Sequence, residues 1–499
     1  MVKRSAGELL FAIAVDRSLG RSVTTQVYGA IRKLITAGDL PAGKRLPSSR
    51  TLARELGVSR TTTLAAFERL TSEGLIVSRT GSGSYVSNLA ETSRPTLEIH
   101  TPGTPPRPAS ASLADIIADA SPRFFQRLSH PLKARAFVTG LPDYDAFPLA
   151  VWAKLAAKHW RQPRDEIMGY SDASGLLRLR RAIAEHLRAN RGISCDAEQI
   201  FIVNGAQQAF DLIGRVLLNP GDPVWFENPG AIGARNSLIA CGARMVPVPV
   251  DREGLSVEAG MAMASDFRLA FVTPAHQHPT GAEMSLVRRR ELLAAAGRSR
   301  AWIIEDDYDG EFRYDGRPLP TLKSGDTAER VIYVGTFSKT MFPALRLGFY
   351  IAPKPLVAAF QRISGAFLQG VPSSIQAVLA AFIEEGHFAT HLRRMREIYA
   401  ERHAAFHEAS NRCLAGMMEA RRSSAGFHVV GRFALPHVDE DRVSADADAA
   451  GLVASPIGRF CIERAGVAPG LVLGVSAIDR RAIANGVETL ARVLERQVG

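Results

Sequence analysis

The sequence predicts two domains: a small N-terminal domain, mainly helical with a β-hairpin, and a large C-terminal α/β domain. A chain of 499 residues exceeds what one hydrophobic core usually holds. A stretch with five prolines, at 95, 102, 105, 106 and 108, interrupts the pattern of apolar residues. Before this stretch the apolar spacing is helical, whereas after it short apolar runs alternate with amphipathic segments.

The composition is that of a soluble globular protein, with 46% hydrophobic and 22% charged residues. No apolar run approaches the ~18–20 residues that span a bilayer, so we expect no membrane association. The cysteines at 195, 241, 413 and 461 lie too far apart for a CxxC motif, which predicts no metal site and a reducing, cytoplasmic compartment.

The positive charge is concentrated at the N-terminus. Residues 1–88 hold 13 Lys/Arg and 6 Asp/Glu, a net +7 of the chain's +11. A basic module on a nearly neutral body favours a polyanionic partner for that module. A merely solvated basic surface is the alternative, and charge alone does not separate the two.

Three short helices are predicted in the first domain. Apolar residues recur on one helical face at Val27, Ile31, Leu34 and Ile35. Ser48 or Ser49 then caps a second helix that buries Leu52, Ala53 and Leu56, and Gly57 supplies a turn. Ser59 caps a third helix, whose apolar face carries Leu64, Phe67 and Leu70. The second and third helices form a helix-turn-helix.

A β-hairpin follows, because LIVSRTGSGSYVS (75–87) alternates around a Gly-Ser-Gly turn. Helix-turn-helix plus hairpin is a winged helix. The N–H groups and hydroxyls at the start of the third helix suit phosphate oxygens, and Arg60 suits phosphate or a guanine edge. Arg79 and the tip at 80–84 lie where they reach an adjacent groove or backbone.

The motifs LPSSR, GVSRTT and SRTGSGSYV resemble the GntR-type winged helix over residues 22–88. The resemblance implies binding of double-stranded DNA through Arg50, Ser59, Arg60, Thr61, Thr62 and the wing around Gly81. A winged helix used for protein contacts is the alternative, and the basic charge favours DNA. Residues 89–133 are predicted to be a Pro/Ser-rich linker that contains a helix within 113–128.

Residues 134–499 predict an α/β domain with a largely parallel sheet. Apolar runs such as QIFIVNG, PVWFENP and AWIIEDDY are typical of strands buried on both faces. Ligands bind at the carboxyl ends of such strands. The first candidate there is the turn Gly205, Ala206 and Gln207, which opens a helix and offers N–H groups to a phosphate.

Two further strand ends carry side chains that suit a cofactor. Asp306, with Tyr308 behind it, is an acid that needs a cation or donor if it is buried, although a solvated acidic loop is the alternative. Lys339 follows a buried strand and forms a Schiff base once desolvated. Thr336, Ser338 and Arg346 suit a phosphate. Together they suit pyridoxal 5′-phosphate (PLP), with Asp306 at the pyridine nitrogen and Tyr308 at the phenolic oxygen.

The order of these motifs resembles the fold-type-I aminotransferases. GYSDASGLLRLRRAIAEHL, TPAHQHPTG, IIEDDYDGEFRYDGRPLP and VGTFSKTMFPALRLGF are similar, more narrowly, to the MocR family, which fuses a GntR-type winged helix to an aminotransferase-like domain. The resemblance implies a PLP-binding regulator that forms a head-to-tail homodimer.

Three positions depart from the family pattern. Ala231 stands where an aromatic usually stacks on the pyridine ring, and His278 stands where Tyr or Phe is usual. No Arg occurs between Arg464 and Arg480, where many aminotransferases grip the substrate carboxylate; Val472 aligns there. Arg235 is a candidate for a substitute clamp on an effector, and the alternative is that it pairs on a helix surface. His278 is a second candidate contact, although a tolerated replacement of the aromatic is the favoured alternative.

The leading hypothesis is a PLP-dependent, DNA-binding transcriptional regulator that responds to a small, amine-bearing effector. A true aminotransferase with a fused DNA-binding domain is the alternative, which the missing arginine and aromatic disfavour. A dimerisation scaffold without PLP is a third reading, which the set of Asp306, Tyr308, Lys339 and Arg346 disfavours.

Overall fold

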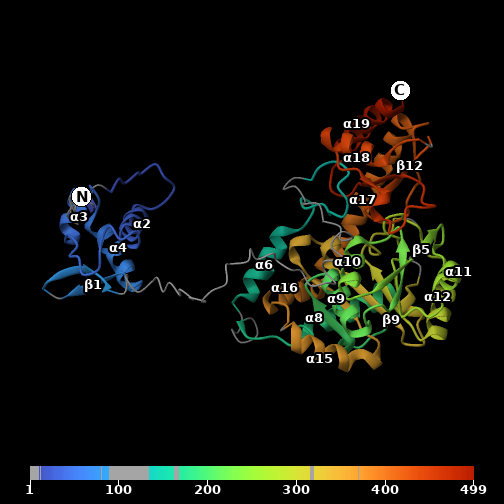
Figure 1. The fold of residues 1–499 in the computed structure, drawn as a ribbon, viewed down its shortest axis with the longest axis horizontal. Helices are drawn as coiled ribbons and strands as arrows, with labels where there is room; N and C mark the ends of the chain where they lie inside the picture. Colours follow the sequence, from blue (N-terminus) through green and yellow to red (C-terminus); the bar gives the residue numbers. More distant parts are fainter. Residues whose placement is uncertain are drawn as a thin grey trace, which may run out of the picture. The chain divides into compact units, whose positions relative to one another are not determined.

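The computed structural model describes residues 10–11, 13–79, 81–88, 134–161, 168–314, 320–368, 370–435 and 437–498. The predicted linker at 89–133, the helix expected within it and position 80 of the wing lie outside these residues. The chain divides into two compact units, residues 1–111 and 112–499, and each is described by itself (Figure 1).

The N-terminal unit holds the predicted helix-turn-helix and hairpin. Helices α2 (Val23–Thr36), α3 (Ser49–Glu55) and α4 (Arg60–Ser72) precede strands β1 (Ile76–Arg79) and β2 (Gly83–Val86), which pair antiparallel. Ser48 and Ser59 accept hydrogen bonds from the first turns of α3 and α4, so both helices begin at capping serines. Gly57 adopts a φ of 62° in the turn between them.

The core of this unit comes from its own helices and hairpin, and includes Val27, Ile31, Leu52, Phe67, Leu70 and Ile76. The prediction for Leu64 was wrong, because its side chain is 38% exposed while Thr63 is fully buried. The Thr63 hydroxyl donates to the carbonyl oxygens of Ser49 (2.9 Å) and Arg60 (3.0 Å), which removes the cost of burying it.

An eight-stranded sheet forms the centre of the C-terminal unit, in the order β3-β10-β9-β8-β7-β4-β5-β6. Its strands are β3 (Ile200–Val203), β4 (Pro223–Asn228), β5 (Arg244–Asp251), β6 (Gly254–Leu255), β7 (Leu269–Val272), β8 (Trp302–Asp307), β9 (Val331–Thr336) and β10 (Gly348–Ile351). Strands β5, β4, β7, β8 and β9 are parallel, whereas β10 runs antiparallel to both β9 and β3. The sheet is therefore largely parallel, as predicted.

Alternating side chains of these strands enter cores on opposite faces, which explains their continuous apolar sequence. Ile202, Tyr333 and Phe349 belong to one core, and Phe201, Val334 and Tyr350 to another. The covering helices are α8 (Leu177–Arg191), α9 (Ala206–Leu217), α10 (Ile232–Ala240), α11 (Val257–Met263), α12 (Leu286–Ser299), α13 (Leu322–Gly325), α15 (Val357–Phe367) and α16 (Ser373–Glu384).

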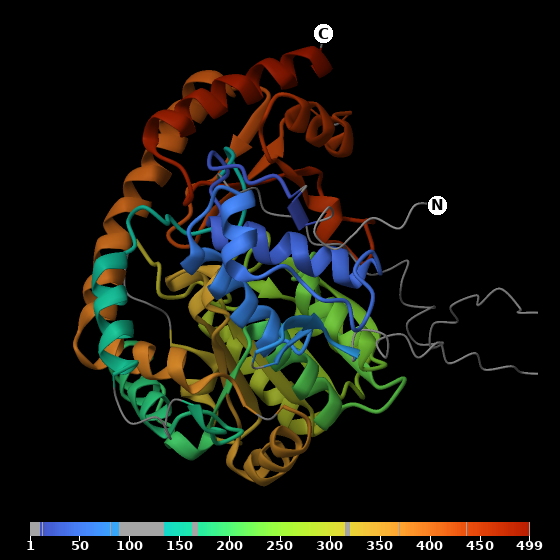
Figure 2. The same ribbon diagram turned by 90° about the vertical axis from the view of Figure 1, so that its left-hand side faces the viewer.

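A second, antiparallel sheet lies toward the C-terminus, in the order β11 (Met418–Ala420), β12 (His428–Phe433), β14 (Gly470–Gly474) and β13 (Ser455–Pro456). Helix α17 (His387–Cys413) contacts both α16 beside the large sheet and α19 (Arg480–Val498) beside the small one (Figure 2). The remaining elements are α6 (Leu149–His159), α14 (Phe337–Thr340), α18 (Glu440–Ala449), η3 (Ala197–Gln199), η4 (Pro343–Leu345), η5 (Lys354–Leu356) and η6 (Ile457–Phe460).

Candidate functional site

The predicted site residues of the C-terminal unit gather at one edge of the large sheet. Strands β3, β8 and β9 point the same way, so their carboxyl ends meet there. Strand β10 lies between β3 and β9 and runs the opposite way, so its first residue, Gly348, pairs with Val203 and Thr336 at this edge. Arg346 lies two residues before β10 and thereby joins the strand ends.

The Gly205 turn and Arg346 place a helix N-terminus beside a guanidinium. Arg346 donates from Nη2 to the Asn204 carbonyl oxygen at 2.9 Å, and an added Cβ at Gly205 would lie 3.7 Å from its guanidinium. Gly205 has a φ of 83° and caps α9, whose first N–H groups, including those of Ala206 and Gln207, have no acceptor within the helix. Arg346 is exposed. A helix N-terminus beside a guanidinium suits a phosphate.

Asp306 is a buried acid with an unsatisfied carboxyl oxygen. Its side chain is 7% exposed and Oδ1 accepts no hydrogen bond, so the solvated-loop alternative is wrong. Burial, and then the carboxyl groups of Asp307 and Asp309, raise the pKa of Asp306 well above its usual range. The charge of Lys339 opposes this rise. A cation placed against Oδ1 would offset the cost of the buried charge.

Lys339 lies in α14, directly after β9. Its Nζ donates to the Gly140 carbonyl oxygen at 2.5 Å, and an added Cβ at Gly140 would lie 2.5 Å from Nζ. The Thr336 hydroxyl caps this helix by accepting from the Ser338 N–H at 3.2 Å, which leaves its own hydrogen to donate elsewhere. Lys339, Thr336 and Ser338 are each partly exposed, so all three are accessible from the sheet edge.

Tyr308 lies against a histidine that the sequence reading did not single out. The Tyr308 hydroxyl is 3.1 Å from His276 Nδ1, and the same nitrogen is 2.9 Å from Asp309 Oδ2. Burial, with Asp309 and Asp306 nearby, raises the pKa of Tyr308 well above its usual range, so the phenol stays protonated. His276 stands in the quoted motif TPAHQHPTG, and its neighbour Gln277 was passed over too.

The two candidate effector residues lie in different surroundings. The His278 ring packs edge-on against Tyr308 at 5.6 Å, and its Nδ1 is buried without a partner. Burial and the charge of Lys339 lower the pKa of His278 to about 3, so the ring is neutral. Arg235 is 6% exposed and donates to the Cys461 carbonyl oxygen at 3.0 Å. It therefore ties α10 to the chain before β14 and does not lie on a helix surface.

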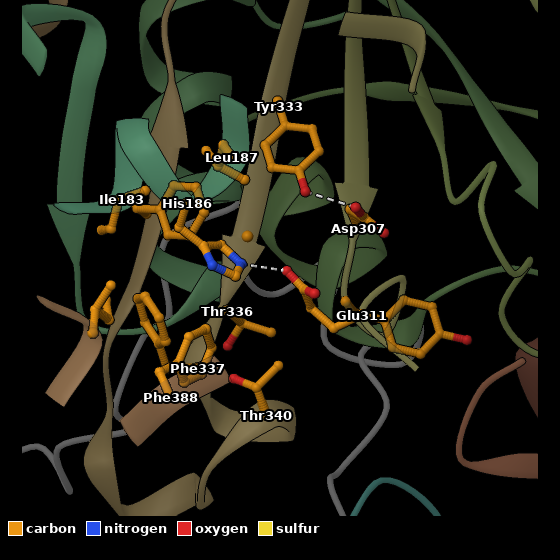
Figure 3. Close-up of a pocket in the computed structure, with 14 residues that line it drawn as sticks. Ile183, His186, Leu187, Asp307, Glu311, Tyr333, Thr336, Phe337, Thr340 and Phe388 are labelled. Carbon is orange, nitrogen blue, oxygen red and sulfur yellow. Dashed lines mark hydrogen bonds and ion pairs between the residues drawn. The ribbon is translucent and has the colours of Figure 1, made fainter. Parts of the chain in front are cut away.

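Figure 3 shows a small cavity of about 30 Å³ next to the strand ends. Asp307 projects here and is paired with the Arg191 guanidinium and the Tyr333 hydroxyl (2.6 Å), while His186 contacts Glu311 at 2.7 Å. The cavity has room for about one water molecule and is too small for a cofactor. Asp307 and Asp306 thus leave β8 in different directions.

The predicted DNA-contacting residues lie in the first turn of α3, at the start of α4 and on the wing. Arg50, Ser59, Arg60, Thr61 and Gly81 are exposed, and Thr62 is half-buried. The Ser59 hydroxyl lies 2.7 Å and 2.8 Å from those of Thr61 and Thr62, so three hydroxyls crowd the helix N-terminus. The sequence reading missed Arg45, whose Nε would lie 3.4 Å from an added Cβ at Gly83 of the wing.

The residues at the sheet edge fit PLP. An anion cradle at Gly205 and Arg346, an amine at Lys339 and an unpartnered buried carboxylate at Asp306 match its phosphate, aldehyde and pyridinium groups. No group of three or more His, Cys, Asp and Glu side chains positioned to hold a metal occurs in the part of the chain that the structure describes. Among the same residues, no helix is long and apolar enough to cross a membrane.

Family models and known proteins agree with this geometry. The family model for bacterial regulatory proteins of the gntR family matches residues 23–86. The family model for aminotransferases of class I and II matches residues 137–462. The chain is 40% identical over 482 residues to a probable rhizopine catabolism regulatory protein, MocR, of Rhizobium meliloti, covering 96% of this chain and 95% of that protein. It is 32% identical to the pyridoxine biosynthesis regulator PdxR of Corynebacterium glutamicum, over 78% and 79% of the two chains.

The kynurenine aminotransferase of Pyrococcus horikoshii, solved with PMP, is similar with a TM-score of 0.68 and 26% identity, covering 78% of this chain and 96% of that one. Fold and site therefore define a class of protein in which a DNA-binding winged helix is joined to an aminotransferase-like domain of fold type I. Within that class the chain belongs to the MocR family of transcriptional regulators.

Proposed function

We propose that the C-terminal domain binds PLP through a Schiff base at Lys339, and that a small amine-bearing effector acts at the same site. One observation carries the proposal: the buried, unpartnered Asp306 lies within the electrostatic reach of Lys339, at the sheet edge that also holds Arg346. Such an acid is costly unless a cationic group faces it. The pyridinium of PLP is such a group.

The side chains divide the work of holding the cofactor. Arg346, the N–H groups at Gly205, Ala206 and Gln207, and the hydroxyls of Thr336 and Ser338 bind the phosphate. Asp306 holds the proton on the pyridine nitrogen, and Tyr308 donates to the phenolic oxygen. Bound PLP supplies an electrophilic carbon that reacts with amines. In the DNA-bound protein, Arg50, Ser59, Arg60, Thr61, Thr62 and the wing at Gly81 contact the duplex.

Borohydride reduction of the purified protein tests this proposal. We expect the cofactor mass on the peptide that contains Lys339, and we expect Lys339→Ala to abolish the absorbance band of the Schiff base. Lys354→Ala is the matched control, because Lys354 is exposed and lies in η5. The labelling of any other lysine, or an unchanged spectrum in Lys339→Ala, would contradict the assignment.

A true aminotransferase is the second candidate, which the similarity to solved aminotransferases favours. Against it, Val472 of β14 is fully buried in an apolar cluster with Ile457 and Phe460 and offers no cation. Without a carboxylate clamp, of roughly 1.5–3 kcal/mol, ordinary α-amino acids should bind ten- to a hundredfold more weakly. We expect little or no keto acid when Ala, Glu or Asp is added to the loaded protein. Multiple turnovers at ordinary aminotransferase rates would favour the enzyme instead.

We further propose that two copies of the chain form a head-to-tail dimer in the cytoplasm. Large apolar side chains are exposed in and after α6: Leu149 (67%), Trp160 (59%) and Tyr170 (95%). Exposed apolar groups of this size are typical of interfaces. Sedimentation of the loaded protein should give the mass of a dimer.

A further inference from the structure

His276 and Asp309 form a sealed pair behind Tyr308. Each is 1% exposed, and His276 Nδ1 lies 2.9 Å from Asp309 Oδ2 and 3.1 Å from the Tyr308 hydroxyl. An added Cβ at Gly426 would lie 2.3 Å from His276 Nδ1 and 2.7 Å from Asp309 Oδ2, so backbone closes the pair from the other side. Water does not reach these contacts, so a donor or acceptor that lacks a protein partner here stays unsatisfied.

The hydrogen bonds assign the proton. A carboxylate only accepts, so Nδ1 of His276 must carry a hydrogen to bond Asp309. That nitrogen then has no lone pair for Tyr308, and its N–H is the donor in the 3.1 Å contact as well. The hydrogen of the Tyr308 hydroxyl is therefore not used by His276. It is left to point toward the strand ends.

We propose that His276 is a positioning residue: by donating from Nδ1 to Oδ2 of Asp309, it keeps the Tyr308 hydrogen directed at the phenolic oxygen of the cofactor. The inference rests on the proposed function, since it concerns PLP bound at Lys339. Without the His276 N–H, Oδ2 of Asp309 is left without a donor, and the phenol, which contacts the same histidine nitrogen, is the group placed to supply one. Tyr308 would then turn away from the cofactor.

The other groups around His276 do not compete for this role. On its far side Nε2 lies 3.3 Å from the Ser423 hydroxyl, which donates to the Ala425 carbonyl oxygen at 2.6 Å. His278, His403 and His428 surround the ring, and burial lowers the pKa of each, to about 3 for His278 and about 4 for His403. They are neutral near pH 7, and the group that contacts Nδ1 of His276 at 2.9 Å is Asp309.

Two substitutions separate the hydrogen bond from packing. In His276→Asn the amide nitrogen takes the place of Nδ1 and can still donate to Asp309. In His276→Gln the amide reaches the place of Nε2, near Ser423, and the donor to Asp309 is lost. The readout is the pH midpoint at which the absorbance of bound PLP changes. When Tyr308 donates no hydrogen bond, the phenolic oxygen of the cofactor is more basic. The proton that this oxygen shares with the lysine nitrogen is then lost at a higher pH.

We expect His276→Gln to raise this midpoint by about one pH unit, the size of one hydrogen bond, and His276→Asn to stay near the wild type. Tyr308→Phe should raise it similarly, and adding His276→Gln to Tyr308→Phe should change nothing further. Equal shifts in both His276 variants, no shift in either, or additive shifts in the double variant would overturn the inference. Wild-type protein without an absorbance band from bound PLP would instead refute the proposed function. If His276→Gln fails to fold, the comparison of His276→Asn with Tyr308→Phe decides: a shift as large as that of Tyr308→Phe overturns the inference, and a wild-type midpoint supports it.

Discussion

Adjacent carboxylates on β8 show how one strand end serves two purposes. Asp307 is paired with Arg191 and Tyr333, so its charge is neutralised within the fold. Asp306, one residue earlier, projects elsewhere and its Oδ1 meets no donor. The chain therefore stores an uncompensated acid at the point where the proposed cofactor presents a cation.

Replacement of Asp306 by Asn should reveal this cost in the cofactor-free protein. Burial, followed by Asp307 and Asp309, raises the pKa of Asp306 above its ordinary 3.8, so the folded state binds more protons than the unfolded state. The free energy of unfolding therefore falls as pH rises above that value, and Asp306→Asn should make the fall less steep. Urea unfolding between about pH 5 and 8 measures the slope.

The same variant should bind PLP ten- to a hundredfold more weakly, because a charge-assisted hydrogen bond contributes about 1.5–3 kcal/mol. Asp196→Asn is the control, since Asp196 is exposed and precedes the amino end of β3, whereas the candidate site lies at the carboxyl ends of the strands. An unchanged pH slope together with unchanged PLP affinity would mean that Asp306 faces no cofactor.

Local elements were predictable from the sequence where their signals are local. The capping serines of α3 and α4, the wing turn and the ends of β3, β8 and β9 depend on neighbouring residues and were located correctly. Leu64 was misplaced because Thr63 is buried through a hydrogen bond to Ser49, fourteen residues away. His276 was missed because its partners, Asp309 and Ser423, lie 33 and 147 residues along the chain.

At the start of α4, Arg60→Ala should weaken DNA binding by about 1–3 kcal/mol if Arg60 reads a base. Arg32→Ala is the control, because it removes the same charge at a different place. Arg32 contacts Glu73 at the opposite end of α4, so its replacement should change DNA binding little. The DNA affinity of both variants is measured by electrophoretic mobility shift with the DNA upstream of the protein's own gene, over a range of salt concentrations. Equal losses in the two variants would indicate general charge rather than a contact at the helix start.

The whole chain consists of two units with separate hydrophobic cores. Among the residues that the structure describes, the core around Val27, Leu52 and Phe67 draws on positions 10 to 86, and the cofactor candidates all lie beyond position 200. Net charge follows the same division, with +7 in the first 88 residues. Each unit thus has its own source of stability.

Calorimetry of the full chain should therefore show two unfolding transitions. Saturation with PLP at about 100 times its Kd should stabilise the unit that contains Lys339 by roughly 2.7 kcal/mol and leave the winged-helix transition in place. Lys339→Ala should remove most of that shift. A single transition, or an equal displacement of both by PLP, would show that the units unfold together.

The independent core of the winged helix also has a genetic consequence. A chain that has lost Lys339 keeps everything that folds its DNA-binding unit, so it still competes for the same operator. In a cell that carries both alleles, such a chain occupies promoters without responding to the inducing signal. Alleles damaged at the cofactor site should therefore be trans-dominant.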